Sequence, residues 1–376
     1  MFAAATLRIA HLTASRFYGG PERQMLGLGR SMRAMATTVF ASYSEKGLSA
    51  DFVQRARTEG FHAFVLRYDT PRLVASCGEL VRLLRSASVA LVCCHGYKPN
   101  LVGLLAARSL GIPIIAVSRG WTGETLRVRF YEALDRFALR WMDQVVCVSH
   151  SQAHKVVRAG VPLSKVRVIP NAIHTARFAE VDQRFRERLR QMFSEPPSLI
   201  VGAAGRLSPE KGFDVLIDAA ALVTRANPST GFVLFGDGAL RQRLVQQAEA
   251  KGLNGRFVFA GFRSDLDKYL PHLDLVVLPS RTEGLPNVAL EAHAAGVPIV
   301  ATAVGGTPDV VQDRVTGYLV PSEDPGTMAR RVQDLLVSEA VRRDMGARGR
   351  ERVRWEFSFD SQARAYRSLF EAMMSK

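Results

Sequence analysis

Both halves of this 376-residue chain alternate short β-rich runs with longer stretches of helical periodicity. In the first half, strand-like runs at Leu7–Thr13 and Val89–Cys94 are separated by helix-like segments such as Glu22–Met35. The second half repeats the pattern, with strand-like runs at Leu199–Ala204 and Leu275–Leu278. Strands that alternate with helices predict parallel sheets covered by helices. We therefore expect an α/β protein built from two Rossmann-like domains.

The boundary between the two halves is predicted from a break in this pattern. A basic, helix-like stretch at Arg184–Met192 is followed by two adjacent prolines, which disfavour helix. The tail, Phe359–Met373, is amphipathic, as expected of a helix that packs on a larger body. We predict a first Rossmann-like domain over residues 1–172, which a C-terminal helix at about 358–376 joins, and a second domain over residues 173–357.

The positive charge of the chain is concentrated in its first half. The net charge is +15, and residues 1–194 hold 28 Lys and Arg against 13 Asp and Glu, whereas residues 195–376 hold equal numbers. A basic half suggests an anionic partner, such as phospholipid headgroups or a phosphorylated substrate. Because the basic residues lack a stacking aromatic motif, we expect no nucleic-acid partner. A solubilising surface is the alternative that composition leaves open.

Four cysteines without a CxxC or other metal-ligand spacing indicate buried thiols in a reducing compartment.

No stretch approaches the roughly 18 consecutive apolar residues of a membrane-spanning helix. The first apolar run is interrupted by Arg8 and His11, so it reads as a first strand rather than as a signal peptide. We therefore expect a cytoplasmic protein that binds peripherally at the inner face of the plasma membrane.

Three glycine-containing loops follow predicted strands, at the edge where such sheets bind ligands. Gly19 and Gly20 precede a helix whose free N–H groups could hold an anion, although a tight turn is an equal interpretation. Arg206 and Lys211 lie five residues apart in one loop and could neutralise a diphosphate. Two solvated surface charges are the alternative there. Gly236 ends the next strand and permits a ligand to approach the backbone closely.

The most specific segment runs from Pro279 to Ala292 and has one glutamate in a loop and another in the predicted helix that follows. Carboxylates accept hydrogen bonds from sugar and ribose hydroxyls, and the first amides of a helix hold phosphate oxygens. The second glutamate is followed by small apolar residues, and a buried glutamate needs a partner. A nucleotide-sugar site needs such parts, and Glu283 and Glu291 are its candidate carboxylates, with two solvated glutamates as the alternative.

The two glutamates are separated by seven residues, and this E-x7-E motif resembles that of the retaining glycosyltransferase family 4. The loops at Gly19-Gly20, Gly205–Gly212 and Gly236–Gly238 resemble those of the same family. The resemblance covers nearly the whole chain and departs from the family pattern at Ala172, where Gly is common, and at Leu285, where Phe is common. It implies the GT-B fold, with two Rossmann-like domains that face a cleft: an N-terminal acceptor domain and a C-terminal nucleotide-sugar donor domain.

The resemblance also implies roles for individual residues. Arg206 and Lys211 would bind the donor diphosphate and stabilise the leaving group. Glu291 would hold the ribose hydroxyls, and Glu283 would contact the transferred sugar. His95, at the end of a predicted strand, would lie near the reacting sugar, although a lone histidine there is more often structural. Further substrate contacts are implied for Gly19, Gly20, Lys98, Gly236, Gly284, Leu285, Pro286 and Asn287, and residues 119–124 would shape the acceptor side.

The implied reaction retains the anomeric configuration and needs no metal and no cofactor beyond the nucleotide-sugar substrate. Asp265-Leu266-Asp267 spells DxD, but it follows a candidate helix cap, and we interpret it as the start of a helix. The basic, amphipathic segment Leu126–Arg140 is a candidate for contact with an anionic membrane.

We therefore expect the transfer of a hexose from a UDP-sugar or GDP-mannose to a lipid-linked or polysaccharide acceptor. The expected setting is cell-envelope, lipopolysaccharide or exopolysaccharide biosynthesis. A UDP-sugar 2-epimerase of similar architecture and a catalytically inactive glycan- or nucleotide-binding relative are the alternatives.

Overall fold

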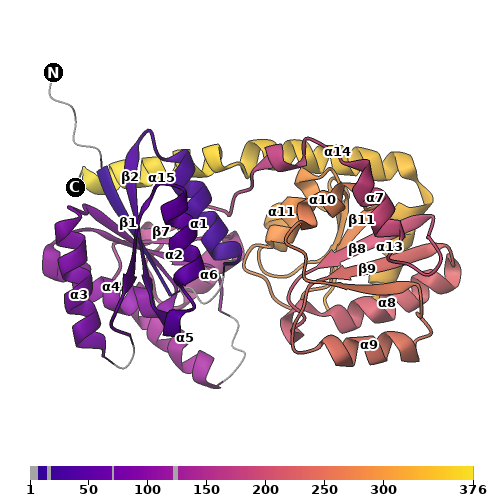
Figure 1. The fold of residues 1–376 in the computed structure, drawn as a ribbon, viewed down its shortest axis with the longest axis horizontal. Helices are drawn as coiled ribbons and strands as arrows, with labels where there is room; N and C mark the ends of the chain where they lie inside the picture. The colour runs from indigo at the N-terminus through magenta and orange to yellow at the C-terminus, as the bar shows by residue number, and fades with distance from the viewer. Residues whose placement is uncertain (1–6, 15–17, 70–71, 122–125, 376) are drawn as a thin grey trace. The chain divides into compact units, whose positions relative to one another are not determined.

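The computed structural model of the chain describes residues 7–14, 18–69, 72–121 and 126–375. The described residues form two compact units, divided after Ala172 and again before Phe359, so that the C-terminal helix belongs to the first unit. Each unit contains one sheet flanked by helices (Figure 1). The described part of the chain has no helix with the length and apolar character that a membrane crossing needs.

The first unit has a seven-stranded, fully parallel sheet in the order β3-β2-β1-β4-β5-β6-β7. Its central strands are buried along their whole length, as expected where helices cover both faces. One face packs on α3 to α6, and the other packs on α1, α2 and α15. The strands are β1 (Leu7–Thr13), β2 (Ala36–Tyr43), β3 (His62–Leu66), β4 (Leu91–His95), β5 (Ile114–Ser118), β6 (Gln144–Cys147) and β7 (Val166–Val168), and the helices are α1 (Gly20–Ser31), α2 (Ala50–Thr58), α3 (Leu73–Ser86), α4 (Tyr97–Leu110), α5 (Leu126–Leu139), α6 (His150–Arg158) and α15 (Phe359–Met374).

The second unit has a six-stranded parallel sheet in the order β10-β9-β8-β11-β12-β13. One face packs on α8, α9 and α13, and Figure 1 shows α10 and α11 on the opposite side. The strands are β8 (Leu199–Ala204), β9 (Thr230–Phe235), β10 (Phe257–Gly261), β11 (Leu275–Leu278), β12 (Ile299–Thr302) and β13 (Gly317–Val320), and the helices are α7 (Gln183–Arg190), α8 (Phe213–Ala226), α9 (Arg241–Ala250), α10 (Leu266–Tyr269), α11 (Asn287–Ala294), α12 (Thr307–Val310), α13 (Pro325–Val337) and α14 (Glu339–Glu356).

Both sheets reverse their strand order beside the first strand of the unit. The reversal lies between β1 and β4 in the first unit and between β8 and β11 in the second. Two doubly wound sheets of this kind are Rossmann-like, so the predicted fold class is confirmed. In such sheets the loops diverge at the reversal, and ligands bind there, outside the carboxyl ends of the strands.

All four cysteines are free thiols. Cys93, Cys94 and Cys147 are buried, as predicted, and burial raises the pKa of each thiol. The prediction was wrong for Cys77, which lies on α3 and is only partly buried.

Candidate functional site

Two loops of the second unit meet at the reversal point of its sheet. The loop after β8 contains a short 3₁₀ helix, Pro209–Lys211, and the loop after β11 leads into α11. Because β8 and β11 are neighbours in the sheet, their carboxyl ends lie side by side. The backbone N–H of Arg281 donates to the carbonyl of Glu210 at 2.8 Å, which joins the two loops directly.

This junction brings together two of the residues predicted from the sequence. The Lys211 ammonium lies 2.7 Å from Oε1 of Glu283, and the Ser280 hydroxyl donates to the same oxygen at 2.7 Å. The Glu283 side chain is 10% exposed and that of Lys211 is 26% exposed, so the pair is partly shielded but open to solvent. A cation and a carboxylate therefore stand together where a charged ligand can reach them.

Arg206 lies in the same loop but has a different partner. Its guanidinium donates to the Glu210 carboxylate at 2.8 Å, and the arginine side chain is 58% exposed. Glu210 also accepts from the hydroxyl of Ser208 at 2.5 Å. Both predicted diphosphate ligands are thus paired with carboxylates of the chain, and an incoming diphosphate would compete with those carboxylates.

Two glycines allow neighbouring loops to lie directly against these two loops. Gly305, after β12, has φ +54°, and a Cβ there would overlap the backbone carbonyl of Glu283. Gly236, after β9, has φ +138°, and a Cβ there would overlap the carbonyl of Gly205. L-residues with side chains avoid such conformations. The backbone around Glu283 therefore depends on a glycine of the neighbouring loop, the one that follows β12.

The rest of the E-x7-E segment is shared between the loop and α11. Leu285 and Pro286 are buried, and Pro286 is the cap residue of the helix that begins at Asn287. Gly284 and Glu291 are partly buried. The helix places its first amides beside the loop that carries Glu283, which is the arrangement that the motif predicts.

In the first unit, His95 ends β4 and is hydrogen-bonded at both ring nitrogens. Nη1 of Arg119 lies 3.1 Å from His95 Nδ1, and His95 Nε2 lies 2.9 Å from Nδ1 of His11. A guanidinium can only donate, so His95 Nδ1 accepts and its proton is on Nε2. That proton is donated to His11 Nδ1, and His11 is therefore protonated at Nε2. Both nitrogens of His95 are occupied within the chain, although sequence analysis predicted a contact with the reacting sugar.

The histidine pair is deeply buried on the sheet face that α1 and α15 cover. His11 is 1% exposed and His95 is 7% exposed, and the two rings stack with centroids 5.2 Å apart. Burial lowers the pKa of His11 to about 3 and that of His95 well below its ordinary value, and the positive charge of Arg119 acts in the same direction. Both imidazoles are therefore neutral at physiological pH.

Lys98 is also engaged within the first unit. Its ammonium forms an ion pair with Glu45 at 2.8 Å and a second one with Asp69, and it lies 4.2 Å from the ring centroid of Tyr43. The side chain is 11% exposed. Lys98 thus ties the loops after β2 and β3 to the start of α4, and its predicted role as a substrate ligand stays a prediction.

The glycine pair of the first unit lies at the start of α1. The helix begins at Gly20, and the N–H of Gly19 donates to the Glu22 carboxylate at 2.9 Å. Residues 15–17 and residues 122–125, which include part of the predicted acceptor segment, lie outside the described residues. The described part of that segment contains Trp121, whose indole N–H donates to Asp135 of α5 at 3.0 Å.

The structure contains functional candidates that sequence analysis missed. His11 pairs with His95, Asp135 holds Trp121, and Arg281 joins loops of the second unit. His11 could have been noticed as a polar residue inside an apolar strand. Arg281 could have been noticed because it lies two residues before the E-x7-E motif. Neither signal identifies a partner, because the partners come from distant parts of the chain.

No group of three or more His, Cys, Asp or Glu side chains suited to a metal ion occurs within the described ranges. Asp267 of the DxD sequence lies in the first turn of α10 and pairs with Arg177 at 2.9 Å. Asp265, rather than Ser264, is the cap residue of that helix. The structure thus places the DxD sequence at the start of a helix.

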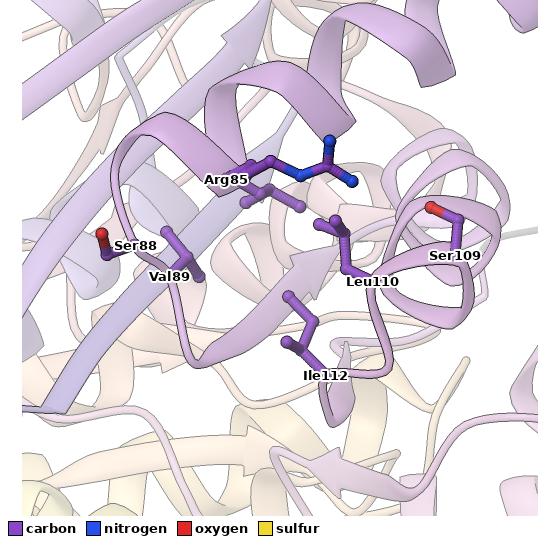
Figure 2. A pocket seen from close by; sticks show the side chains of 7 residues that line it. Arg85, Ser88, Val89, Ser109, Leu110 and Ile112 are labelled. Carbon is purple, nitrogen blue, oxygen red and sulfur yellow. The ribbon is translucent and has the colours of Figure 1, made fainter.

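A shallow hollow of about 370 Å³ lies at the opposite edge of the first sheet (Figure 2). It is formed where α3 and α4 end and where the chain enters β4 and β5, which is the amino-terminal edge of those strands. It therefore lies away from the carboxyl ends at which the predicted site residues gather. Its lining residues are Leu84, Arg85, Ser88, Val89, Ser109, Leu110 and Ile112.

Comparison with known proteins assigns both units to one enzyme class. Residues 18–177 match the family described as "Glycosyltransferase Family 4", and residues 185–352 match "Glycosyl transferases group 1". The 2-deoxystreptamine N-acetyl-D-glucosaminyltransferase of Streptomyces fradiae is 30% identical over 362 residues, which cover 86% of this chain and 84% of that enzyme.

A second relative is a galactosyltransferase of Escherichia coli that is named for UDP-Gal and for α-D-GlcNAc-diphosphoundecaprenol. It is 27% identical over 255 residues, which cover 65% of this chain and 66% of that enzyme, so the chain spans just under two thirds of its length. Among solved structures, Anabaena Alr3699/HepE in complex with UDP and glucose superposes with a TM-score of 0.84 at 20% identity, covering 97% of this chain and all of that one. This similarity confirms the overall fold that the resemblance implied.

Proposed function

The chain belongs to glycosyltransferase family 4, and from that premise we propose that it transfers a hexose from a nucleotide-diphosphate sugar to a lipid-linked or polysaccharide acceptor, with retention of configuration. The observation that carries this proposal is the Lys211–Glu283 pair, which lies at the reversal point of the second sheet beside the first turn of α11. The pair supplies both groups that a sugar diphosphate requires, a cation for the diphosphate and a carboxylate for sugar hydroxyls.

The donor is proposed to be a UDP-sugar. The E. coli relative is named for UDP-Gal, and the Anabaena structure contains UDP. Arg206 and Lys211 would stabilise the departing diphosphate by charge, so no metal is required for the leaving group. Glu291, one turn into α11, is proposed to hold the ribose, and the N–H groups at Gly284 to Asn287 would lie beside the sugar and phosphate.

Thermal unfolding with a panel of nucleotides tests the donor proposal. UDP at about one hundred times its dissociation constant should stabilise the wild-type protein by about 2.7 kcal/mol, with or without Mg²⁺. Lys211→Ala removes a charge-assisted contact worth about 1.5 to 3 kcal/mol, so its UDP affinity should fall at least tenfold. Lys251→Ala, which breaks a surface pair with Asp218, is the matched control and should retain the UDP response. The absence of a shift with UDP, GDP, ADP and dTDP would overturn the proposed donor class.

The acceptor is proposed to be presented at an anionic membrane. Phe130, Phe137 and Trp141 are 62%, 59% and 59% exposed. Phe130 and Phe137 are seven residues apart, which puts them on one face of α5. Trp141 lies in the turn that follows the helix, with its ring centroid 6.4 Å from that of Phe137. Arg129 and Arg140 are exposed on the same segment. Exposed aromatic side chains flanked by arginines suit the headgroup region of an anionic bilayer, and the E. coli relative is named for a diphosphoundecaprenol-linked acceptor.

Co-sedimentation with vesicles tests the membrane proposal. At low salt the wild-type protein should bind vesicles that contain phosphatidylglycerol. It should bind neutral phosphatidylcholine vesicles more weakly. Changing Phe130, Phe137 and Trp141 together to Ser should weaken that binding at least tenfold, because even one inserted aromatic side chain contributes about 1.5 to 3 kcal/mol. Changing the exposed Val337 and Trp355 of the second unit to Ser is the control and should leave binding unchanged. Equal binding by the triple variant would contradict the assignment of α5 as the contact face.

A further inference from the structure

One guanidinium joins three loops at the carboxyl edge of the second sheet. Nη1 of Arg281 donates to the carbonyl of Pro209 at 2.7 Å and to Oδ1 of Asp214 at 2.9 Å. Nη2 donates to Oδ2 of Asp214 at 2.8 Å and to Oε2 of Glu323 at 3.1 Å, and Nε donates to Oε1 of Glu323. A guanidinium has five N–H donors. All five donors of Arg281 therefore have acceptors within the second unit.

The acceptors come from separate segments of the chain. Pro209 begins the 3₁₀ helix between β8 and α8, and Asp214 lies in the first turn of α8. Glu323 lies in the loop between β13 and α13, and Arg281 itself lies in the loop after β11. The backbone N–H of Arg281 adds the bond to the Glu210 carbonyl. Arg281 is thus the shared anchor of loops that are up to 114 positions apart in sequence, from Pro209 to Glu323.

We infer that Arg281 is a positioning residue that sets the spacing between Lys211 and Glu283, an inference that rests on the proposed donor site. Lys211 ends the 3₁₀ helix that Arg281 holds through the carbonyls of Pro209 and Glu210. Glu283 lies two residues after Arg281 on the same loop. The side chain and backbone N–H of Arg281 therefore hold the segment that ends in Lys211, while Arg281 itself belongs to the loop that carries Glu283.

Stability alone is a weak explanation for this arrangement. The side chains of Arg281, Asp214 and Glu323 are 31%, 36% and 56% exposed, and ion pairs this exposed contribute little to folding. Glu323 has φ +60°, a strained conformation for a residue with a side chain. The hydrogen bond from Arg281 lowers the pKa of Asp214, so this carboxylate stays charged at neutral pH. Glu323 thus has a strained backbone at the same position where its carboxylate accepts hydrogen bonds from Arg281. Local strain of this kind is typical of a functional constraint.

Affinities for UDP and UMP provide a test that does not depend on turnover. Lys211 is proposed to contact the diphosphate, so a displaced Lys211 should weaken the binding of UDP more than the binding of UMP. Arg281→Lys keeps the charge but loses the planar fork that bridges the loops. We expect Arg281→Lys to lower the ratio of UDP affinity to UMP affinity about tenfold, because a charge-assisted contact is lost. We also expect it to lower kcat by a larger factor than it raises KM for the donor. Asp214→Asn should change both quantities in the same direction, but less.

The melting temperature and a second arginine provide the controls. Arg348→Lys, on an exposed helical pair with Asp344, should leave the affinity ratio and kcat unchanged. A wild-type affinity ratio and wild-type kcat in Arg281→Lys would overturn the inference. So would a fall in melting temperature with equal loss of UDP and UMP binding, which would mark a structural role only. If the wild-type protein binds neither nucleotide, the proposed donor class has failed instead, and the inference fails with it.

Discussion

Replacement of Glu283 by Gln is expected to lower the transfer rate at least about a hundredfold and, at the same time, to tighten the binding of free UDP. The carboxylate is proposed to contact the transferred sugar, and loss of one preorganised charged group costs on the order of a hundredfold in rate. The same carboxylate lies 2.7 Å from the Lys211 ammonium and therefore competes with a diphosphate for it. Gln keeps the shape of the side chain and removes the competing charge.

The size of the gain in affinity follows from the two kinds of hydrogen bond. A bond between Lys211 and a charged acceptor contributes about 1.5 to 3 kcal/mol, whereas a bond to a neutral acceptor contributes about 0.5 to 1.5. The difference of about 1 kcal/mol corresponds to UDP binding about fivefold more tightly. Opposite effects of one substitution on UDP binding and on turnover are not expected from a general loss of structure.

Calorimetric titration with UDP and steady-state kinetics with the donor measure the two effects separately. Ser280→Ala is the matched control, because it removes one neutral hydrogen bond to Glu283 and leaves both charges in place. It should change UDP affinity less than Glu283→Gln does. Weaker UDP binding in Glu283→Gln, comparable to that of Lys211→Ala, would show that Glu283 supports the diphosphate site rather than competing for it.

The strands were predictable because buried parallel strands are continuous apolar runs between turn residues. The predicted ranges Leu7–Thr13 and Leu199–Ala204 agree with β1 and β8 residue for residue. The helix α14 was not expected, since its 18 residues include Gly346 and Gly349, and interior glycines disfavour helix. In the structure a Cβ at Gly346 would overlap the carbonyl of Gly296. Close tertiary packing thus explains a residue choice that local propensity opposes.

The candidate site was predictable only where its residues are close in sequence. The E-x7-E segment carries its own loop, cap and helix, so its residues could be identified together. Lys211 and Glu283 were both predicted as ligands, but their mutual ion pair joins residues 72 positions apart. The partners of His95 depend on the strand order β1-β4-β5, which places His11 and Arg119 on either side of it. Such pairings depend on sheet order and register, which the sequence pattern does not specify.

Acidification is expected to destabilise the first unit steeply, because His11 and His95 stay neutral in the folded protein. In the unfolded chain each imidazole takes up a proton below about pH 6.5, whereas the pKa of folded His11 is lowered to about 3 and that of His95 is lowered well below its ordinary value. Between those limits the unfolded state binds more protons, so the free energy of unfolding falls as the pH falls. At pH 4.5 the neutral His11 costs about 3 kcal/mol relative to neutral pH, and the neutral His95 adds to the loss.

The surroundings of the pair support this direction. Arg119 faces His95, with Glu22 of α1 and Tyr366 of α15 as its charged and titratable neighbours, and no carboxylate hydrogen-bonds to either imidazole among the described residues. Asp135 of the same unit has a raised pKa because it is buried, and its protonation offsets part of the loss. The expected net slope is therefore somewhat below the roughly 3 kcal/mol per pH unit that two protons give.

Denaturant unfolding between pH 7 and 4.5, followed by a spectroscopic signal of the first unit, measures the slope of its free energy of unfolding against pH. His11→Gln should halve it, because the amide oxygen can still accept from His95 Nε2–H but takes up no proton. His154→Gln, at an exposed position of α6, should leave the slope unchanged. An unchanged slope in His11→Gln would show that His11 gains its proton in the folded state. The tautomer derived for His95 would then fail as well, because a protonated His11 Nδ1 has no lone pair to accept the His95 proton.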